Sequence, residues 1–517
     1  MALNKNLIKR SLLEVFNKYG YGRDGLELIK RLGILAGSIG YNSFLIGGFV
    51  RDIIIYSMKI NPETSSRFAS SKVFNISKKE IEQDTRLDID IVLEGNAERF
   101  AESIRERNDI GFAINSIKIH KRFRTASVEF LINKKPLKVD LASARTETYL
   151  NHGALPAVSI GGASLKDDVS RRDFTINTIA FSLNTDGSSN GSGLPGGVHI
   201  GARRLRAFLA VKDYAGGLSD ILNKKIRVLH DLSFKEDPTR IFRAVRFEKR
   251  LGFSIERHTG TLIKNALDAR VLDNISGKRI TAELNLLLKE KNPEIYLARL
   301  EALGVLKGIY SKLGFNESNE RVFRKIAKSC KTSKNTHIFY IAELLHHLNK
   351  AEFNAAIERL ALGEKIKQTI SSMYLEAKSL ASLFSELDEV KKKCADKLCE
   401  DKLLKLKNSE IYLMFKGFSE GGILFYFFKN NNKGELALNF AKWAEKFINK
   451  IRFIKPAISG NDIKSFGICE GPVCGSILEE IKLLKMDGKL KSKDAEVLYV
   501  KNKYIVKKME GLKNDRV

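Results

Sequence analysis

Two short apolar runs, each interrupted by small or acidic residues, constrain the fold of this chain more than any other feature. Residues 44–52 read FLIGGFVRD, and residues 87–93 read LDIDIVL. In an extended strand, residues i and i+2 point to the same face, so Asp88 and Asp90 should project together from one strand. Two such carboxylates repel each other unless a cation lies between them, and hard oxygen ligands favour Mg²⁺. The pattern therefore predicts a strand that carries a magnesium site.

A glycine pair, Gly47 and Gly48, ends the first run. Glycine lets backbone N–H groups approach a phosphate closely, and a helix that begins there adds a favourable dipole. Arg51 is placed to clamp a phosphate, and Asp52 suits either a cap or a salt bridge. With the aspartate pair, these residues predict a site for a metal-bound nucleoside triphosphate.

Composition narrows the class of partner. The chain has 517 residues and a formal charge of +28, from 89 Lys and Arg against 61 Asp and Glu. Such an excess favours a polyanion, because neutralising phosphates releases counterions; a solvated basic surface is the alternative. Five scattered cysteines make a zinc site unlikely and fit a reducing compartment. No apolar run reaches the roughly 18 residues of a membrane span, so no membrane partner is expected.

The hydrophobic period changes along the chain. Strands are predicted at residues 43–46, 87–93, 111–118, 125–132 and 136–142, with helices from Gly48 onward and at residues 96–107. Residues 174–181 are predicted to be helical. Residues 238–453 show an almost unbroken period of 3.6, which indicates an all-α region. The basic residues 1–18 suit a helix packed on the first domain better than a transit peptide, so a cytoplasmic protein is expected.

Two later clusters carry further candidate residues. Arg171 and Arg172 precede Asp173, and we expect one arginine to contact phosphate and the aspartate to accept from a ribose hydroxyl or to orient an arginine. Asp237 and Arg240 lie three apart at the start of a helix, where Asp237 also suits the cap. A carboxylate beside a guanidinium matches the base edges of cytosine and adenine better than those of guanine and uracil.

A basic stripe continues along the same helix at spacings of three and four residues. We expect it to follow RNA phosphates, with a solvated helix face as the alternative. Its members are Arg243, Arg246, Lys249 and Arg250.

Together these motifs resemble the class II tRNA nucleotidyltransferase and bacterial poly(A) polymerase family, from about residue 41 to 300 and more weakly to about 490. The matching segments are residues 47–52 with 87–90, 171–177, 213–220, 236–240, 276–284 and 458–475. The chain departs from the family in a longer, Gly-rich segment at 184–205, and in Arg124, which stands where the family often has glycine near a flexible loop.

The resemblance implies a polymerase-β-like α/β nucleotidyltransferase head with a small mixed sheet, followed by an all-α neck, body and tail. The implied segments are an N-terminal helical extension (1–40), the head (41–228), the neck (229–300), the body (301–453) and an RNA-binding tail (454–517). The implied activity is addition of CCA to tRNA 3′ ends from CTP and ATP with Mg²⁺. Addition of CC only or A only, polyadenylation, and an inactive RNA-binding descendant are the alternatives. The oligomeric state stays open.

The resemblance also implies a role for each candidate residue. Asp88 and Asp90 would hold the metal. The nucleotide would be bound by Gly47, Gly48, Arg51, Arg171, Arg172, Asp173, Asn177, Asp237 and Arg240, of which the last two would act as an amino-acid template for C and A.

Overall fold

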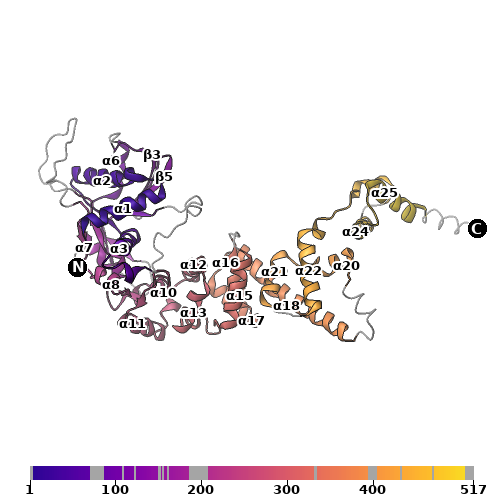
Figure 1. Ribbon diagram of the computed structural model, residues 1–517. Coiled ribbons are helices and arrows are strands. Elements are labelled where there is room, and N and C mark those ends of the chain that lie inside the picture. Colours follow the sequence, from indigo (N-terminus) through magenta and orange to yellow (C-terminus); the bar gives the residue numbers. More distant parts are fainter. Residues whose placement is uncertain are drawn as a thin grey trace, which may run out of the picture. The chain divides into compact units, whose positions relative to one another are not determined.

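The computed structural model describes residues 4–69, 87–106, 110–121, 124–148, 153, 156–159, 162–184, 208–330, 335–393, 405–430, 434–468 and 471–506. The chain forms two compact units (Figure 1). Unit 1 comprises Met1–Gly314 with Arg359–Ala361, and unit 2 comprises Phe315–Glu358 with Leu362–Val517. The finer division into five segments stays a prediction.

A seven-stranded mixed sheet forms the framework of unit 1, in the order β3-β4-β5-β2-β1-β8-β9. Its strands are β1 (Asn42–Ile46), β2 (Ile89–Glu94), β3 (Ala113–His120), β4 (Thr125–Ile132), β5 (Lys135–Ser143), β8 (Ala180–Ser182) and β9 (Val211–Lys212). Strand β1 pairs antiparallel with β2 and β8, whereas β2 and β5 run parallel. Two small two-stranded sheets join β6 (Thr146–Thr148) to β7 (Ala157–Ser159) and β10 (Lys225–Ile226) to β11 (Ser254–Ile255).

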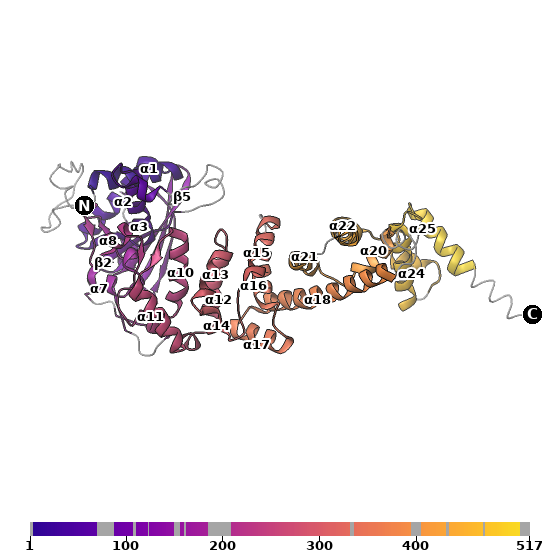
Figure 2. The same ribbon diagram turned by 60° about the horizontal axis from the view of Figure 1, so that its bottom comes forward.

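Helices α1 (Lys5–Tyr19), α2 (Gly22–Ser38) and α3 (Gly48–Ile60) pack together beside the sheet (Figure 2). Apolar residues recur along α1 every three or four positions, which gives the helix one buried face. The N-terminus of α1 is capped by Asn4, whose side chain accepts a hydrogen bond from the Asn6 amide. In the sheet, Phe44, Ile46 and Val92 pack against α7 (Leu165–Ser170).

Residues 174–181 are not the helix that their pattern predicts. A single 3-10 turn, Thr175–Asn177, is followed by β8. Phe174 forms a bridge to Val228, and β8 pairs with both β1 and β9. Sheet pairing therefore outweighs the local helical pattern.

Helices complete unit 1 beyond the sheet. Their bounds are α4 (Ser65–Phe68), α6 (Ala97–Glu106), α8 (Gly217–Leu222), α9 (Ser233–Glu236), α10 (Thr239–Leu251), α11 (Arg257–Asp268), α12 (Gly277–Leu288), α13 (Glu294–Ala302) and α14 (Val305–Ile309). Helix α10 lies against α12 and α13. The buried side of α10 is apolar except for a few polar residues, and its arginines recur at residues 240, 243 and 246.

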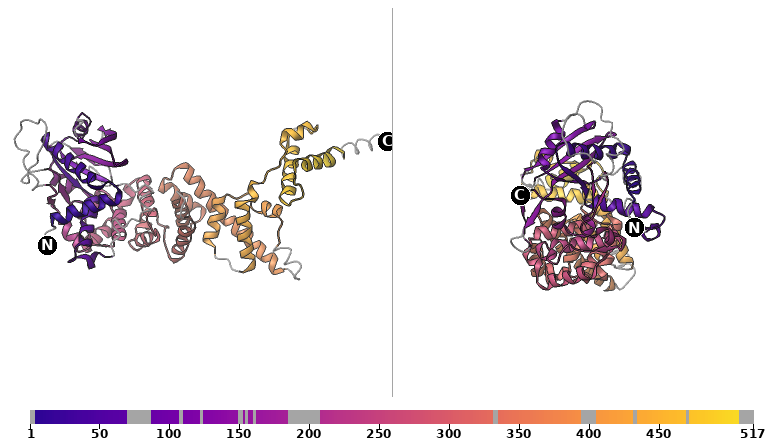
Figure 3. Two further views of the ribbon diagram at one scale, coloured as in Figure 1. Left: turned by 45° about the horizontal axis from the view of Figure 1, so that its top comes forward. Right: turned by 90° about the vertical axis from the view of Figure 1, so that its left-hand side faces the viewer.

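The described part of unit 2 consists of helices only (Figure 3). They are α15 (Glu317–Ser329), α16 (Thr336–Leu345), α17 (Lys350–Leu360, whose last residues belong to unit 1), α18 (Glu364–Lys393), α20 (Asn408–Phe415), α21 (Glu420–Lys429), α22 (Glu435–Asn449), α23 (Gly460–Ser465), α24 (Pro472–Met486) and α25 (Lys493–Val500). No helix in the described ranges is long and apolar enough to cross a membrane.

Two departures from the resembled family fall near the head. Most of the Gly-rich segment 184–205 lies outside the described residues. Arg124 has a φ of 47°, in the left-handed region that favours glycine. The backbone at this position therefore has the conformation for which glycine is the usual choice.

Candidate active site

Strand β2 and the residue before it bring two carboxylates to the site, and a third lies beside them on β5. Asp90 lies in β2 opposite Ile46 of β1, and exposed Asp88 precedes the same strand. Burial raises the pKa of Asp90 to about 6; nearby Arg172 lowers it, whereas Asp140 and Asp88 raise it further. The Asp90 carboxylate is thus a site that a cation would stabilise.

Asp140 is the third carboxylate, and sequence reasoning missed it. It is the register partner of Asp90 in the parallel pair β2–β5, so both side chains point to the same side of the sheet. Its carboxylate accepts hydrogen bonds from Ser127 Oγ (2.5 Å) and Lys138 Nζ (2.7 Å). The alternating pattern of residues 136–142 was the available signal, but only the pairing reveals the neighbour.

The glycine turn lies directly beside these carboxylates. Gly47 has a φ of +85°, and a Cβ there would approach Asp90 Oδ2 to 3.2 Å and Arg172 Nη1 to 3.9 Å. Gly48 begins α3, whose N-terminal amides and dipole favour an anion. A side chain at Gly47 would fill space beside the carboxylates, so the turn leaves room for a ligand.

Arg51 is held by protein groups instead of facing solvent. Its guanidinium donates to Asp52 Oδ1 (2.7 Å) and Asn177 Oδ1 (2.8 Å), and the residue is 3% exposed. It also lies over the Phe247 ring, 5.0 Å from the centroid. These contacts hold the Arg51 guanidinium against Asn177 at the edge of the cavity described below, and its role as a phosphate clamp stays a prediction.

The adjacent residues Arg171 and Arg172 both donate hydrogen bonds to one buried carboxylate. Asp168 is fully buried and accepts from both Arg171 and Arg172, the latter through Nε (3.1 Å) and Nη2 (2.9 Å). Arg171 also donates to Glu147 (2.8 Å). Arg172 reaches the cavity described below, whereas Arg171 does not.

Asp173 is the centre of a buried hydrogen-bond network. Its carboxylate accepts from Arg243 Nε (2.8 Å), Asn177 Nδ2 (3.0 Å) and the Phe174 amide (2.8 Å). Burial by itself would raise the pKa of Asp173, but Arg243 and these hydrogen bonds outweigh burial and lower the pKa. Asp173 is therefore a fixed anion at the junction between residues 171–177 and α10.

Phe247 of α10 joins these groups. Its ring lies 5.0 Å from the Arg51 guanidinium and 5.5 Å from that of Arg243, and it meets Phe174 edge-on at 5.7 Å. Cation–π contacts with the buried Arg51 and the half-buried Arg243 hold the two guanidinium groups in place. One aromatic ring of α10 thereby contacts both α3 and residues 171–177.

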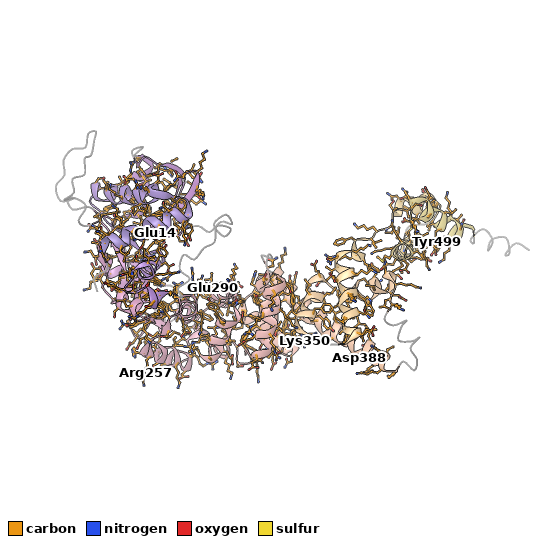
Figure 4. The ribbon with its side chains drawn as sticks, viewed as in Figure 1. Glu14, Arg257, Glu290, Lys350, Asp388 and Tyr499 are labelled. Atoms are coloured by element: carbon orange, nitrogen blue, oxygen red, sulfur yellow. The ribbon has the colours of Figure 1, made fainter. Side chains whose placement is uncertain are left out.

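A cavity of about 690 Å³ brings most of the candidate residues together. Residues from the sequence analysis that line it are Gly47, Gly48, Arg51, Asp88, Asp90, Arg172, Asp173, Asn177, Arg243, Arg246, Lys249 and Arg250. Arg246 is paired there with Glu290 (2.8 Å), which is labelled in Figure 4. The remaining lining includes Tyr19, Asn292 and Tyr296, which sequence reasoning did not single out.

Asp237 and Arg240 do not line this cavity. Asp237 accepts from the Thr239 amide (3.1 Å) and from Arg279 Nη2 (2.7 Å), as expected for a cap. Arg240 is 4% exposed and donates through Nη2 to the Arg171 carbonyl (2.9 Å). Within the described residues, Arg240 Nη1 has no hydrogen-bond partner. The base-reading role of this pair stays a prediction.

The donor set fits a divalent cation. The described residues contain no cluster of three or more His, Cys, Asp and Glu side chains arranged to hold a metal ion. Mg²⁺ usually takes only one or two carboxylates from the protein, and water and substrate phosphates complete its shell. The Asp88–Asp90 pair beside a glycine turn is of this open kind.

Comparison with known proteins identifies two segments of the chain. Residues 43–227 match the poly A polymerase head domain, and residues 252–313 match the probable RNA and SrmB-binding site of polymerase A. The structure is similar to that of a CCA-adding enzyme in an apo form, with a TM-score of 0.66 and 27% identity over 92% of this chain and 95% of the other. A Thermotoga maritima CCA-adding enzyme complexed with tRNA-CCA gives a TM-score of 0.60 and 26% identity, over 92% and 95%.

The A-adding tRNA nucleotidyltransferase of Geobacter sulfurreducens is 31% identical over 95% of this chain and 48% of its own length. That of Aquifex aeolicus is 29% identical over 85% and 44%. The chain thus spans about half the length of these curated relatives. The predicted fold class, a polymerase-β-like head followed by helical segments, is confirmed. The chain is thus similar to poly A polymerases in its head and RNA-binding segments, to A-adding tRNA nucleotidyltransferases in sequence and to CCA-adding enzymes in fold.

Proposed function

We propose that this protein is an enzyme that adds CCA to tRNA 3′ ends from CTP and ATP without a nucleic-acid template. The observation that carries the proposal is the cavity in which the Gly47–Gly48 turn, Asp88 and Asp90 meet the Asp173–Arg243 pair. Solved structures similar to this one include complexes of CCA-adding enzyme with ATP and with CTP. Because its proposed substrate is tRNA, we infer a cytoplasmic protein.

The residues at the cavity would have separate roles in nucleotidyl transfer. The Gly47–Gly48 backbone and Arg172 would bind phosphates, and Asp173 with Asn177 would position the sugar. Asp88 and Asp90 would hold a divalent cation, for which we propose Mg²⁺. Such an ion supplies charge stabilisation for the triphosphate and a lower pKa for the attacking 3′-hydroxyl.

Base selection is proposed for Asp237 and Arg240. Asp237 lies just before α10 and Arg240 in its first turn, and Arg240 keeps one buried donor without a partner among the described residues. A carboxylate acceptor and a guanidinium donor at this turn would match cytosine and adenine.

A-only addition is the second candidate. It is favoured because two relatives that match most of this chain are A-adding enzymes. The CCA and A-only activities use the same nucleotide and metal groups, so the cavity fits both. An inactive RNA-binding descendant is disfavoured, because Asp88, Asp90 and Asp173 are all present at the cavity.

A primer-extension assay tests the proposal. Purified protein and Mg²⁺ are given tRNA transcripts ending before CCA, after C and after CC, with CTP, ATP or both. Growth that stops after CCA on every transcript supports the leading proposal. A single A on the CC-ended transcript alone assigns A-only addition, and RNA binding without incorporation overturns the enzyme proposal.

Asp88→Asn is the matched loss-of-function variant for this assay, with Asp231→Asn as control. Asp88 is exposed at the cavity, whereas Asp231 is exposed elsewhere and pairs with His258 (2.8 Å). We expect Asp88→Asn to slow transfer by about 10²–10³-fold, the usual loss for one preorganised electrostatic contact, and to leave tRNA binding intact. The control should retain full activity.

A further inference from the structure

Tyr19, the last residue of α1, lines the cavity beside the candidate metal ligands. Helix α1 precedes the segment that matches the head domain, which begins at residue 43. The aromatic side chain is therefore brought to the site by an element outside the matched segment.

Contacts with α3 fix the end of α1 in place. Ser57 Oγ donates to Ser11 Oγ (2.7 Å), and the Tyr56 hydroxyl donates to Glu14 Oε2 (3.1 Å). The Phe16 ring packs 6.1 Å from that of Phe49, next to the glycine turn. Tyr19 is thus held in a defined position relative to the turn that begins α3.

The tyrosine is a neutral ring with a hydroxyl donor. It is 7% exposed, and burial, followed by nearby Asp52, raises the pKa of Tyr19 to about 12. Asp88 raises this pKa further, whereas Arg250 lowers it, and both residues line the same cavity as Tyr19. Tyr19 can stack or donate a hydrogen bond at neutral pH, but it cannot act as a base.

The cavity lining combines groups of two kinds. Asp90 lies next to Gly47 and Arg172, the groups suited to the triphosphate. Tyr19 and Asp88 line the same cavity together with apolar, aromatic and cationic residues, which include Leu87, Arg250, Leu251, Ile295 and Tyr296. Aromatic and arginine surfaces of this kind stack unpaired bases and neutralise their phosphates.

We propose that Tyr19 contacts the 3′-terminal nucleotide of the RNA primer and, together with Arg250, holds the hydroxyl-bearing end beside Asp88. The inference rests on the proposed function and deepens it, since it assigns to α1 a part in primer binding. The incoming nucleotide would occupy the Gly47–Asp90 side of the cavity, so the two substrates would depend on different residues.

Steady-state kinetics of Tyr19→Leu, Tyr19→Phe and the unaltered chain test this division. Loss of a stacking contact weakens nucleic-acid binding by roughly 5- to 150-fold. We expect Tyr19→Leu to raise the KM for primer by about tenfold while the KM for ATP changes less than about twofold. Tyr19→Phe keeps the ring and should restore most of the primer affinity.

Tyr56→Leu is the matched control, because Tyr56 also joins α1 to α3 but does not line the cavity. It should leave the KM for primer unchanged. The inference is overturned if Tyr19→Leu leaves that KM unchanged, raises the KM for ATP equally, or behaves as Tyr56→Leu does. A chain that incorporates no nucleotide in any form overturns the proposed function instead.

Photo-crosslinking of the unaltered protein avoids any folding defect in Tyr19→Leu. A tRNA ending in 5-iodocytidine is irradiated with the protein, which is then digested with trypsin after Lys18 and Arg23 and sequenced by mass spectrometry. An adduct on residue 19 supports the inference. Adducts confined to other residues overturn it, even where primer extension succeeds.

Discussion

At the cavity, the buried arginines donate most of their hydrogen bonds to other protein groups. Arg51 is held by Asp52 and Asn177, and Arg243 by Asp173. A guanidinium with fixed partners keeps its position before a ligand arrives, so little order is lost on binding. These arginines therefore position the residues that would meet the nucleotide.

Asp237 allows its two roles to be separated by a pair of variants. Asp237→Ala loses both the cap acceptor and the carboxylate, whereas Asp237→Asn keeps an oxygen for the Thr239 amide. We expect both variants to incorporate UTP and GTP more readily, and Asp237→Ala alone to lose about 1 kcal/mol of stability. Incorporation rates for the four nucleotides and thermal unfolding provide the two measurements.

Unchanged discrimination in both Asp237 variants would leave this residue with the cap role only. Asp231→Asn serves as the surface control, since that carboxylate is exposed and bonded to His258. It should alter neither base choice nor the unfolding temperature.

At this scale the sequence located residues whose signal is local. Gly47, Asp88 and Asp90 stand out by spacing alone, and the structure places all three at the cavity. Asp140 and Tyr19 were missed because their position at the site depends on strand pairing and helix docking. The hydrogen bond from Arg51 to Asn177 could not be predicted either, since Asn177 lies far along the chain and no local pattern pairs the two residues.

Among the helices of unit 2, α16 is followed directly by a half-buried histidine, His346. His346 packs against the rings of Tyr374 (5.8 Å) and Phe425 (5.4 Å). Its Nε2 has no hydrogen-bond partner in the described part of the chain. Burial, helped by the charge of Lys429, lowers the pKa of His346 to about 4.

This histidine should make unit 2 less stable in acid. Between pH 6.5 and about 4 the unfolded chain binds a proton that folded His346 does not, so stability falls as the pH drops through that window. The contribution is at most about 3 kcal/mol. We expect His346→Phe, which cannot titrate, to lose correspondingly less stability between pH 7 and 5.

Urea unfolding followed by the fluorescence of Trp443 measures this difference, because the chain has one tryptophan and it is buried in α22 of unit 2. Burial also raises the pKa of nearby Glu343, but that effect is common to both proteins and cancels. Parallel stability curves for the two proteins would contradict the prediction.

Individual elements were predictable where one pattern dominated. The strand at 125–132 coincides with β4, because the apolar residues Ala126, Val128, Phe130 and Ile132 recur at every second position and are buried. Residues 174–181 failed, because pairing with β1 decides their conformation. A hydrophobic pattern along the chain carries no information on the backbone hydrogen bonds that a distant strand will form.

The whole molecule consists of two units with separate cores, so ligand binding should not stabilise them equally. A ligand present at 100 times its dissociation constant adds about 2.7 kcal/mol to the unit that binds it. We expect ATP with Mg²⁺ to raise the unfolding temperature of unit 1, followed by circular dichroism at a wavelength sensitive to its sheet. The Trp443 transition of unit 2 should move far less.

Coincident shifts of both signals would show one cooperative transition and contradict this expectation. Asp88→Asn provides the control, because weaker metal binding should reduce the shift of unit 1 alone.

The change from mixed to helical architecture was predictable from the hydrophobic period of the sequence. The boundary between Gly314 and Phe315 was not, because both sides are helical and only contacts distinguish them.

The Phe247 ring has a consequence for how this chain can change over generations. It touches guanidinium groups from two segments and a second aromatic ring from a third. An aliphatic replacement would remove all three ring contacts at once. Substitutions of Phe247 are therefore constrained by Arg51, Arg243 and Phe174 together.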